Sequence, residues 1–199
     1  MTPAGRIVWR CGDRVLACGG APLVMGILNV TPDSFSDGNR YFDTDRAVEH
    51  GLAMAAQGAR IVDVGGESTR PGAVAVPEGE EIDRVAPVIE RVCRGLETRG
   101  MKEVLVSVDT SKAAVARGAI EAGASIVNDV TALSGDPEMA GVVREYGAGA
   151  ILMHMRGNPR VMQENPVYGD VVAEVAGRLG SRIRELSAAG IPAERLAVD

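Results

Sequence analysis

The chain has 199 residues and a mass of 20.8 kDa, which is enough for one domain with a substantial hydrophobic core. Its net charge of −6 and isoelectric point near 5.1 argue against nucleic acid or an anionic membrane as general partners. The sequence contains no apolar run long enough to span a bilayer and no signal-peptide core, and its three cysteines do not suggest a disulfide scaffold. We therefore expect a cytoplasmic protein in a reducing environment.

Residues 6–20 alternate apolar and polar side chains around Gly12-Asp13, a pattern typical of a β-hairpin. After the hairpin, short apolar runs alternate with amphipathic stretches. The expected strands are 23–29, 60–65, 103–109, 125–129, 149–154 and 195–199, and the expected helices are 44–57, 79–99, 111–122, 137–146 and 168–189. Near-continuous apolar strands joined by helices predict a parallel sheet.

Capping residues and helix breakers indicate where the helices begin and end. Asp43 and Thr44 can cap the first helix and Ser111 the third. Pro87 lies inside the second helix, where we expect a kink or a restart. Glycines stand where helix C-caps are expected, at positions 58, 100, 123, 147 and 190.

A (β/α)8 barrel and a doubly wound sheet share this alternation, and two observations favour the barrel. No Gly-x-Gly-x-x-Gly turn follows the first strand, as it would in a dinucleotide-binding fold. Polar residues also fall at the C-terminal ends of several strands, where a barrel gathers them around one mouth. These residues are Asn29, Asp63, Asp109, Asn128, His154 and Asp199.

The fold class we predict is α/β, with a hairpin extension at residues 1–22 and a barrel domain at residues 23–199. Eight barrel units need about 250 residues. Six strands and five helices therefore predict an incomplete barrel, and we expect the chain to be an N-terminal fragment. Two open sheet edges and a reduced core lead us to expect that residues 1–199 alone are poorly stable and inactive.

Two strand-to-loop junctions concentrate the polar side chains. Residues 25–37 run from an apolar strand through Asn29 into a loop with hydroxyl, carboxylate and aromatic side chains, and residues 61–72 repeat the design. Parallel α/β proteins build active sites where strands open into such loops. A small-molecule enzyme is therefore the leading interpretation.

The two junctions, Asn29-Val-Thr-Pro-Asp-Ser-Phe-Ser-Asp37 and Gly65-Gly-Glu-Ser-Thr-Arg-Pro-Gly72, resemble those of dihydropteroate synthases, the folate-pathway enzymes that sulfonamides target. Weaker matches follow in the right order: Ser107-Val-Asp-Thr110, Asn128-Asp129 and Leu152-Met-His154. The resemblance covers nearly all of this chain but not the family's whole chain, since a Ser-Arg-Lys and an Arg-x-His segment are absent.

The resemblance implies a (β/α)8 barrel and a transferase reaction. In that reaction 6-hydroxymethyl-7,8-dihydropterin diphosphate and p-aminobenzoate give 7,8-dihydropteroate and diphosphate, with Mg²⁺ as cofactor. It also implies that the full-length protein is a homodimer.

The resemblance assigns residues of the two loops to the diphosphate, the metal and p-aminobenzoate. Asn29 is the Mg²⁺ contact, and its neutral amide oxygen suits that hard cation. Thr69 contacts the diphosphate, and Phe35 lies near p-aminobenzoate. Arg70 and Pro71 also lie on the p-aminobenzoate side. The guanidinium of Arg70 offers a planar set of N–H donors suited to anionic groups.

The strand-end residues are matched to the pterin ring. Asp109, Asn128 and Asp199 suit its aminopyrimidinone edge. Carboxylates accept hydrogen bonds from N–H donors, and an amide can either donate or accept. Met153, with Ile151, is expected to line the ring pocket. Asp37 and Asp109 are the candidate catalytic carboxylates, which stabilise the developing cation.

Other interpretations remain open. Strand-end acids and amides can simply cap neighbouring helices, and we expect Asp63 to be a buried structural partner. A corrinoid-linked pterin methyltransferase shares the pterin-binding barrel, although the block 29–37 argues against it. A non-catalytic pterin-binding homologue is the other alternative.

Overall fold

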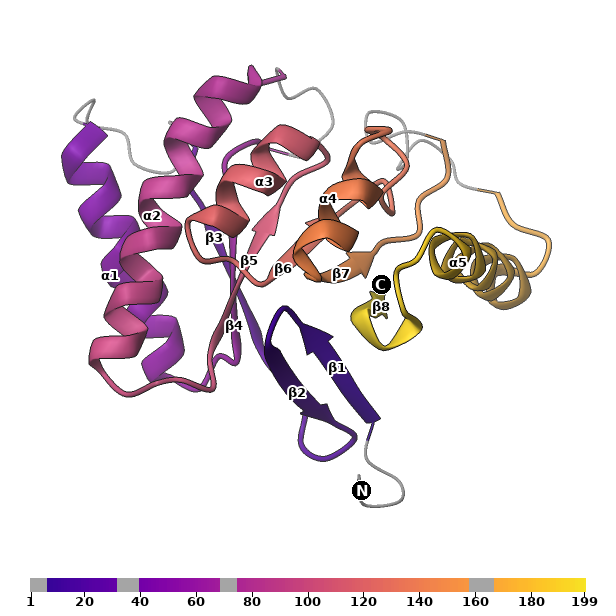
Figure 1. The fold of residues 1–199 in the computed structure, drawn as a ribbon, viewed down its shortest axis with the longest axis horizontal. Helices are drawn as coiled ribbons and strands as arrows, with labels where there is room; N and C mark the ends of the chain where they lie inside the picture. Colours follow the sequence, from indigo (N-terminus) through magenta and orange to yellow (C-terminus); the bar gives the residue numbers. More distant parts are fainter. Residues whose placement is uncertain (1–6, 32–39, 69–74, 158–166) are drawn as a thin grey trace.

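The computed structural model describes residues 7–31, 40–68, 75–157 and 167–199. Strands β1 (Ile7–Cys11) and β2 (Arg14–Cys18) form the predicted antiparallel hairpin. Gly12 has a φ of 61° at its turn, a conformation that glycine adopts without strain. The hairpin is a separate two-stranded sheet that lies beside the rest of the molecule (Figure 1).

The remaining strands form one six-stranded parallel sheet in chain order. They are β3 (Met25–Asn29), β4 (Ile61–Gly65), β5 (Leu105–Asp109), β6 (Ile126–Asp129), β7 (Gly149–Leu152) and β8 (Leu196–Val198). In a doubly wound sheet the strand order reverses, whereas in a barrel each strand pairs with the next. The predicted α/β class and barrel topology are confirmed, with β3 and β8 at the two edges of the described sheet.

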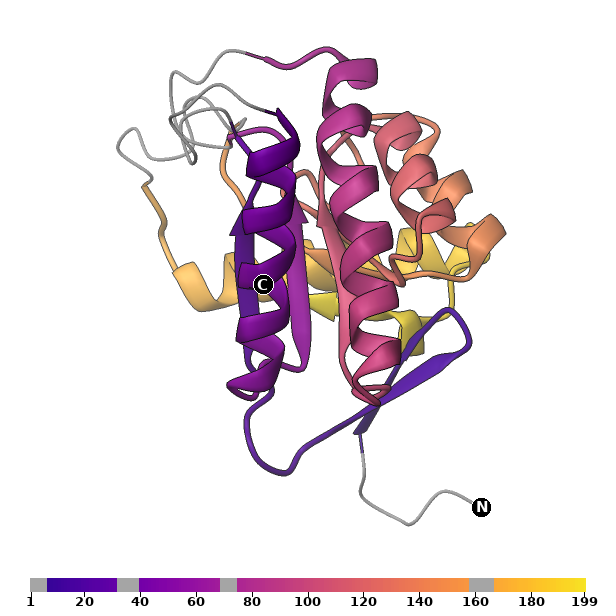
Figure 2. The same ribbon diagram turned by 90° about the vertical axis from the view of Figure 1, so that its left-hand side faces the viewer.

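Helices connect successive strands and cover one face of the sheet (Figures 1 and 2). They are α1 (Arg40–Ala56), α2 (Glu78–Thr98), α3 (Ala113–Glu121), α4 (Met139–Tyr146) and α5 (Val171–Ala188), with a short 3-10 turn, η2 (Ala193–Arg195), before β8. Within the described residues, none of the helices combines the length and the apolar character that crossing a membrane would require.

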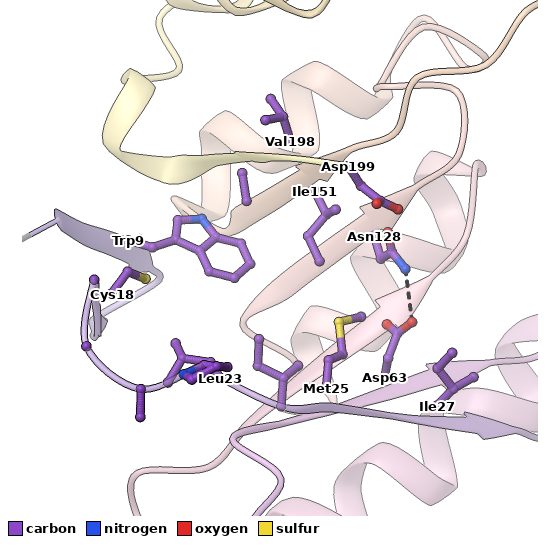
Figure 3. Close-up of a pocket in the computed structure, with 16 residues that line it drawn as sticks. Trp9, Cys18, Leu23, Met25, Ile27, Asp63, Asn128, Ile151, Val198 and Asp199 are labelled. Carbon is purple, nitrogen blue, oxygen red and sulfur yellow. Dashed lines mark hydrogen bonds between the residues drawn. The ribbon is translucent and has the colours of Figure 1, made fainter. Parts of the chain in front are cut away.

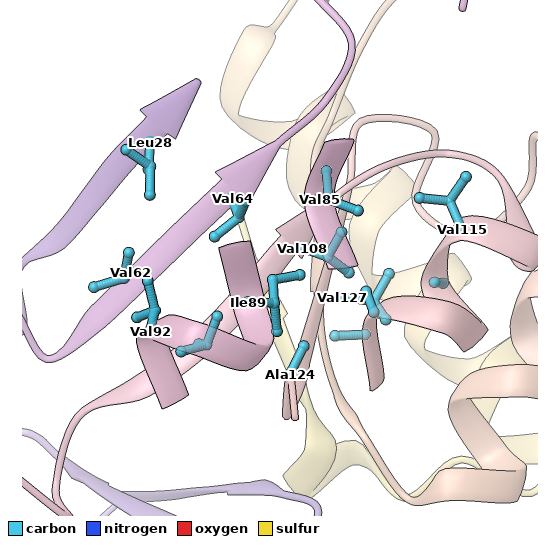
Figure 4. Packing of buried hydrophobic residues seen from close by; sticks show 14 of the residues in the cluster. Leu28, Val62, Val64, Val85, Ile89, Val92, Val108, Val115, Ala124 and Val127 are labelled. Atoms are coloured by element: carbon cyan, nitrogen blue, oxygen red, sulfur yellow. The ribbon is translucent and has the colours of Figure 1, made fainter. Parts of the chain in front are cut away.

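The main core lies between the sheet and these helices (Figure 4). Alternate strand residues point outward from the barrel, among them Leu28, Val64 and Val127, and they pack against Ile89 and Val92 of α2. Because side chains alternate along a strand, the residues between them point to the other face. Asn29, Asp63, Asp109 and Asn128 are thus directed into the barrel interior, whereas His154 is two residues beyond the outward-facing Leu152.

Two predictions of helix caps were wrong. Helix α1 begins at Arg40, so Asp43 and Thr44 lie inside it rather than at its cap. The N-cap of α3 is Lys112, not Ser111, and the backbone N–H of Ala113 donates instead to Asp136 Oδ2 at 2.8 Å. At Pro87, helix α2 does not restart but continues from Glu78 to Thr98, which leaves the kink as the remaining expectation there. By contrast, all five glycines expected at helix ends have positive φ angles.

The hairpin covers the inner face of the sheet at the N-terminal ends of its strands. Trp9 and Cys11 pack in a second apolar cluster with Ile61, Leu105 and Ile126. The Trp9 indole N–H donates to Arg195 O at 2.9 Å, and the Gly12 N–H donates to Gly147 O at 2.9 Å. The interior is therefore closed at one end and leads to the polar strand ends at the other.

Gly149→Ala is expected to lower the free energy of unfolding by about 1–3 kcal/mol, because an added Cβ would overpack the contact with the hairpin. That Cβ would lie 2.7 Å from Cys11 Sγ and 3.3 Å from the Trp9 ring. Urea unfolding of the full-length protein measures the effect. Gly141→Ala is the matched control, since its Cβ would meet no atom within 4 Å, and helix propensity predicts up to about 1 kcal/mol of stabilisation. Equal stability of the Gly149 variant and wild type would contradict this packing.

Candidate active site at the C-terminal ends of the strands

The register of the parallel sheet aligns the predicted strand-end residues. Asn29 pairs with Gly65, Gly65 with Asp109, and Asp109 with Asn128. These residues come from four different strands, yet they form one row at one mouth of the barrel. Three predicted site residues (Asn29, Asp109 and Asn128) are therefore brought to the same rim.

Asp199 and Met153 lie two residues beyond this row, which continues through Ile151 and Ala197. The Asp199 N–H donates to Leu152 O at 3.0 Å, and the Asp199 carbonyl accepts from His154 N at 2.8 Å. This pattern continues the β7–β8 ladder and sets Asp199 opposite Met153. Both residues are thus at the mouth, at its outer edge.

The predicted residues of the two long loops fall outside the described part of the chain. They are Phe35, Asp37, Thr69, Arg70 and Pro71. Their assignments stay predictions.

A cavity of about 630 Å³ occupies the barrel interior between the hairpin and the strand ends (Figure 3). Most of its lining is apolar, whereas Asp63, Asn128 and Asp199 supply carboxylate and amide groups toward the mouth. Apolar walls with a few convergent polar groups are typical of sites for small organic ligands. Ile151 lines the cavity as expected, while Met153, Asn29 and Asp109 are not among the residues that line it.

Asp63 and Asn128 are joined by a hydrogen bond inside this cavity (Figure 3). The Asn128 amide Nδ2 donates to Asp63 Oδ2 at 2.9 Å, and only 3% of Asp63 is exposed. Among the described residues, neither Asp63 Oδ1 nor the buried Ser107 Oγ has a hydrogen-bond partner. Burial raises the pKa of Asp63, and the nearby Ser107 hydroxyl and Asn128 amide offset part of that rise. Asp63 is thus the buried partner that the sequence predicted.

Asp109 lies near four other carboxylates. Burial raises the pKa of its carboxyl to about 7, with further contributions from the negative charges of Asp63, Asp129, Glu81 and Glu67. A carboxyl group with a pKa near neutrality changes its charge in the pH range in which most enzymes act. Such perturbed groups concentrate at functional sites.

A network of charged groups centred on Lys112 lies beside Asp109. Lys112 Nζ donates to the Glu67 carboxylate, to Val76 O at 2.7 Å and to Glu81 Oε2 at 2.5 Å. The other Glu81 oxygen, Oε1, accepts from Thr110 Oγ1 at 2.8 Å, and only 1% of Glu81 is exposed. These bonds, which we call the Lys112 network, tie the ends of β4 and β5 to the start of α2.

The sequence interpretation missed this network. Glu67 belongs to one of the long motifs and Lys112 follows Asp109 closely, so both positions carried a signal. Nothing in the sequence marks Glu81, one of several acids at the start of α2, as the buried one.

Asp129 shapes the loop that follows Asn128. Its carboxylate accepts from the backbone N–H of Thr131 at 2.7 Å and of Leu133 at 2.9 Å. Ala132 and Leu133 have φ angles of 54° and 60°, which side chains other than glycine rarely adopt. Arg182 of α5 donates to the carbonyls of both residues, at 2.7 and 2.6 Å. Asp129 is therefore an organiser of the loop, and Asn128 is the strand-end group left to face the cavity.

The space above Gly65 is bordered by two oxygen atoms. Asn29 Oδ1 and Asp109 Oδ2 each lie 3.6 Å from the position that a Cβ would occupy there. Glycine at this position leaves the space open, and hard oxygen atoms are the donors that Mg²⁺ prefers. The described residues include no group of three or more His, Cys, Asp or Glu side chains able to enclose a metal ion. Asn29 Oδ1 and Asp109 Oδ2 are therefore the oxygen atoms at this rim that could contact such an ion.

Comparison with known proteins assigns the chain and its fold to a family. The family model for pterin binding enzymes matches residues 25–199. The chain is 49% identical over 177 residues to the dihydropteroate synthase of Mycobacterium leprae, covering 88% of this chain and 60% of that protein. It is 48% identical over 178 residues to the dihydropteroate synthase of Escherichia coli, covering 89% of this chain and 61% of that protein.

A solved structure of Xanthomonas albilineans dihydropteroate synthase with 4-aminobenzoic acid has the same fold. Its TM-score is 0.83 at 45% identity, and the match covers 98% of this chain and 66% of that one. The chain thus spans about three-fifths of the length of these bacterial relatives. The match extends over almost all of the parallel sheet and the mouth residues, so the chain belongs to the family of pterin binding enzymes.

Proposed function

We propose that the full-length protein is a dihydropteroate synthase. It would join p-aminobenzoate to 6-hydroxymethyl-7,8-dihydropterin diphosphate and release diphosphate. The observation that carries the proposal is the row of Asn29, Asp109 and Asn128 at one rim of the barrel, where Asn128 also lines the apolar cavity. The relatives named above support it, since each is named for this activity. That residues 1–199 alone are inactive stays a prediction.

The polar groups of the mouth suit the edge of a pterin ring. Asp109 and Asp199 offer carboxylate oxygens to ring N–H groups and the 2-amino group, and Asn128 offers both an acceptor and a donor. Ile151 and the neighbouring apolar residues would contact the ring faces. A site built on such pairings rejects analogues that lack one partner by about 10⁴-fold.

The proposed reaction is a substitution at the methylene carbon attached to the pterin. The C–O bond to the diphosphate breaks with its electron pair, which leaves the methylene electron-poor and conjugated to the ring. The amine nitrogen of p-aminobenzoate then forms the C–N bond and loses a proton. No residue has to attack the substrate, because the charge of Asp109 can stabilise the developing cation through space.

We propose the same role for Asp37 in the first loop, with Phe35 beside the aromatic ring of p-aminobenzoate. In the second loop, Thr69 and Arg70 would donate hydrogen bonds to anionic groups of the substrates, with Pro71 beside them. Mg²⁺ would be held by Asn29, and when bound it would neutralise charge on the leaving diphosphate.

An assay of the purified full-length protein tests the proposal. With both substrates and Mg²⁺, it is expected to release one diphosphate for each dihydropteroate formed, and a sulfonamide is expected to compete with p-aminobenzoate. A non-catalytic homologue would bind pterin without turnover. A corrinoid-linked methyltransferase would instead transfer a methyl group from a methylated pterin to a cobalt corrinoid. Either result would overturn the proposal.

We further propose a cytoplasmic location, since the three cysteines are free thiols, as a reducing environment maintains them. The homodimer implied by the resemblance is part of the same proposal, and sedimentation of the full-length protein would test it.

A further inference from the structure

The hydrogen bond between Asp63 and Asn128 spans three strands. Asp63 is on β4 and Asn128 on β6, and β5 lies between them. The two side chains therefore meet above β5 inside the barrel, 2.9 Å apart, where both line the cavity (Figure 3). Asp63 lies two residues deeper in the barrel than Asn128. The register pairs Asp63 with Ser107, whereas Asn128 pairs with Asp109.

This bond fixes the orientation of the Asn128 amide. An ionised carboxylate only accepts hydrogen bonds, so the amide must turn its Nδ2 toward Asp63. Its Oδ1 and the second N–H of Nδ2 are then the groups left for a ligand. Without a partner of fixed polarity, the amide can rotate by 180° and exchange donor for acceptor.

Packing alone gives no reason for a carboxylate at this position. Two residues deeper, the inward-facing residues are Ile61 of β4 and Leu105 of β5, and both are buried and apolar. Burying a carboxylate costs stability unless its oxygens are fully paired, and Asp63 Oδ1 has no partner among the described residues. Among the described residues, the Asn128 amide donates a hydrogen bond to Asp63 at 2.9 Å, and the nearby Ser107 hydroxyl also lowers the pKa of Asp63.

We propose that Asp63 is a positioning residue that sets the hydrogen-bonding sense of Asn128 and thereby selects the ligand edge that the site accepts. The inference deepens and rests on the proposed function. The ligand class is a flat aminopyrimidinone with an acceptor ring nitrogen beside an amino donor, as in pterin. Lumazine, in which a carbonyl replaces the 2-amino group, presents these two partners in the opposite order.

The test compares the dissociation constants of pterin and lumazine by calorimetry on the full-length protein. Wild type is expected to favour pterin. Asp63→Ala is expected to reduce the pterin preference about tenfold, because an Asn128 amide that can rotate serves either ligand. Asp63→Asn keeps the shape of the side chain but can present either oxygen or nitrogen to Asn128. The pterin preference of this variant should therefore lie between those of wild type and Asp63→Ala. This isosteric variant also covers the case in which the alanine variant does not fold.

Two controls separate positioning from a general loss of structure. Val64→Ala removes buried volume from the next residue of β4, on the outward face, and is expected to lower stability without changing the ligand preference. In an Asn128→Ala background, Asp63→Ala should no longer change the preference, because Asp63 acts through that amide.

The inference is overturned if folded Asp63 variants keep the wild-type preference, or if Asp63→Ala changes it equally with and without Asn128. Wild type that binds no pterin would instead refute the proposed function together with the inference. Pterin binding with an unchanged preference in the variants would leave the proposed function intact.

Discussion

Asp109→Asn is expected to lower kcat/KM by about 10²- to 10³-fold, the usual cost of removing a group that stabilises charge in the transition state. The substitution keeps the shape and a hydrogen-bonding oxygen but removes the negative charge. The same variant should be more stable than wild type above pH 7, because it no longer buries a carboxylate among other acids. A gain in stability with a loss of activity is expected only of a charge kept for function.

The pH dependence of kcat/KM and of the free energy of unfolding follows from the raised pKa of Asp109. The proposed mechanism requires the ionised form of Asp109, so kcat/KM of wild type should rise with pH through about 7, and this rise should disappear in the variant. The pKa of the Asp109 carboxyl is about 7 in the folded protein, whereas its ordinary value, which applies to the unfolded chain, is 3.8. Between these values the folded state binds more protons than the unfolded state, so stability falls as pH rises from about 4 to 7. The full fall is roughly 4 kcal/mol as an upper limit.

Steady-state kinetics and urea unfolding across this pH range measure the two effects. Asp13→Asn, an exposed carboxylate in the hairpin turn, is the matched control and should change neither. Near wild-type activity of the Asp109 variant, with the same dependence on pH, would remove Asp109 from the proposed mechanism.

Lys112→Met is expected to lower the free energy of unfolding by about 3–5 kcal/mol, because it leaves the buried carboxylate of Glu81 without its counter-charge. The methionine retains most of the apolar stem, so the loss reports mainly on the charge. Adding Glu81→Gln to the same chain should recover part of that loss, since the buried negative charge is then gone.

The matched control is Lys102→Met, at an exposed lysine just before β5, which should change stability by less than about 0.5 kcal/mol. Urea unfolding of the three variants in full-length protein at one pH makes the comparison. If Lys112→Met and Lys102→Met proved equally mild, the Lys112 network would not be a structural element of the site.

The positions of the mouth residues could be predicted because they follow from the strand pattern. Each apolar run ends on a polar residue, and parallel pairing in register then brings Asn29, Asp109 and Asn128 into one row without further information. The same reasoning gave the strand order, since consecutive strands joined by helices pair with their neighbours.

The features that the sequence did not predict depend on tertiary contacts. Ser111 was a reasonable cap for α3, but the acceptor is Asp136, which is brought to that helix end by the next loop. Glu81 resembles a solvent-facing residue of α2, and it is buried only because the helix start lies against the end of β5. The bond between Asp63 and Asn128 likewise joins residues 65 positions apart in the sequence.

A crystal structure of the full-length protein with bound pterin would be the most decisive experiment. The predicted result is a ring seated in the barrel interior, with its polar edge hydrogen-bonded to Asp109 and Asn128 and with Asp63 still holding the Asn128 amide. A ring bound away from this mouth, or contacts that involve neither of the two strand-end residues, would contradict the assignment.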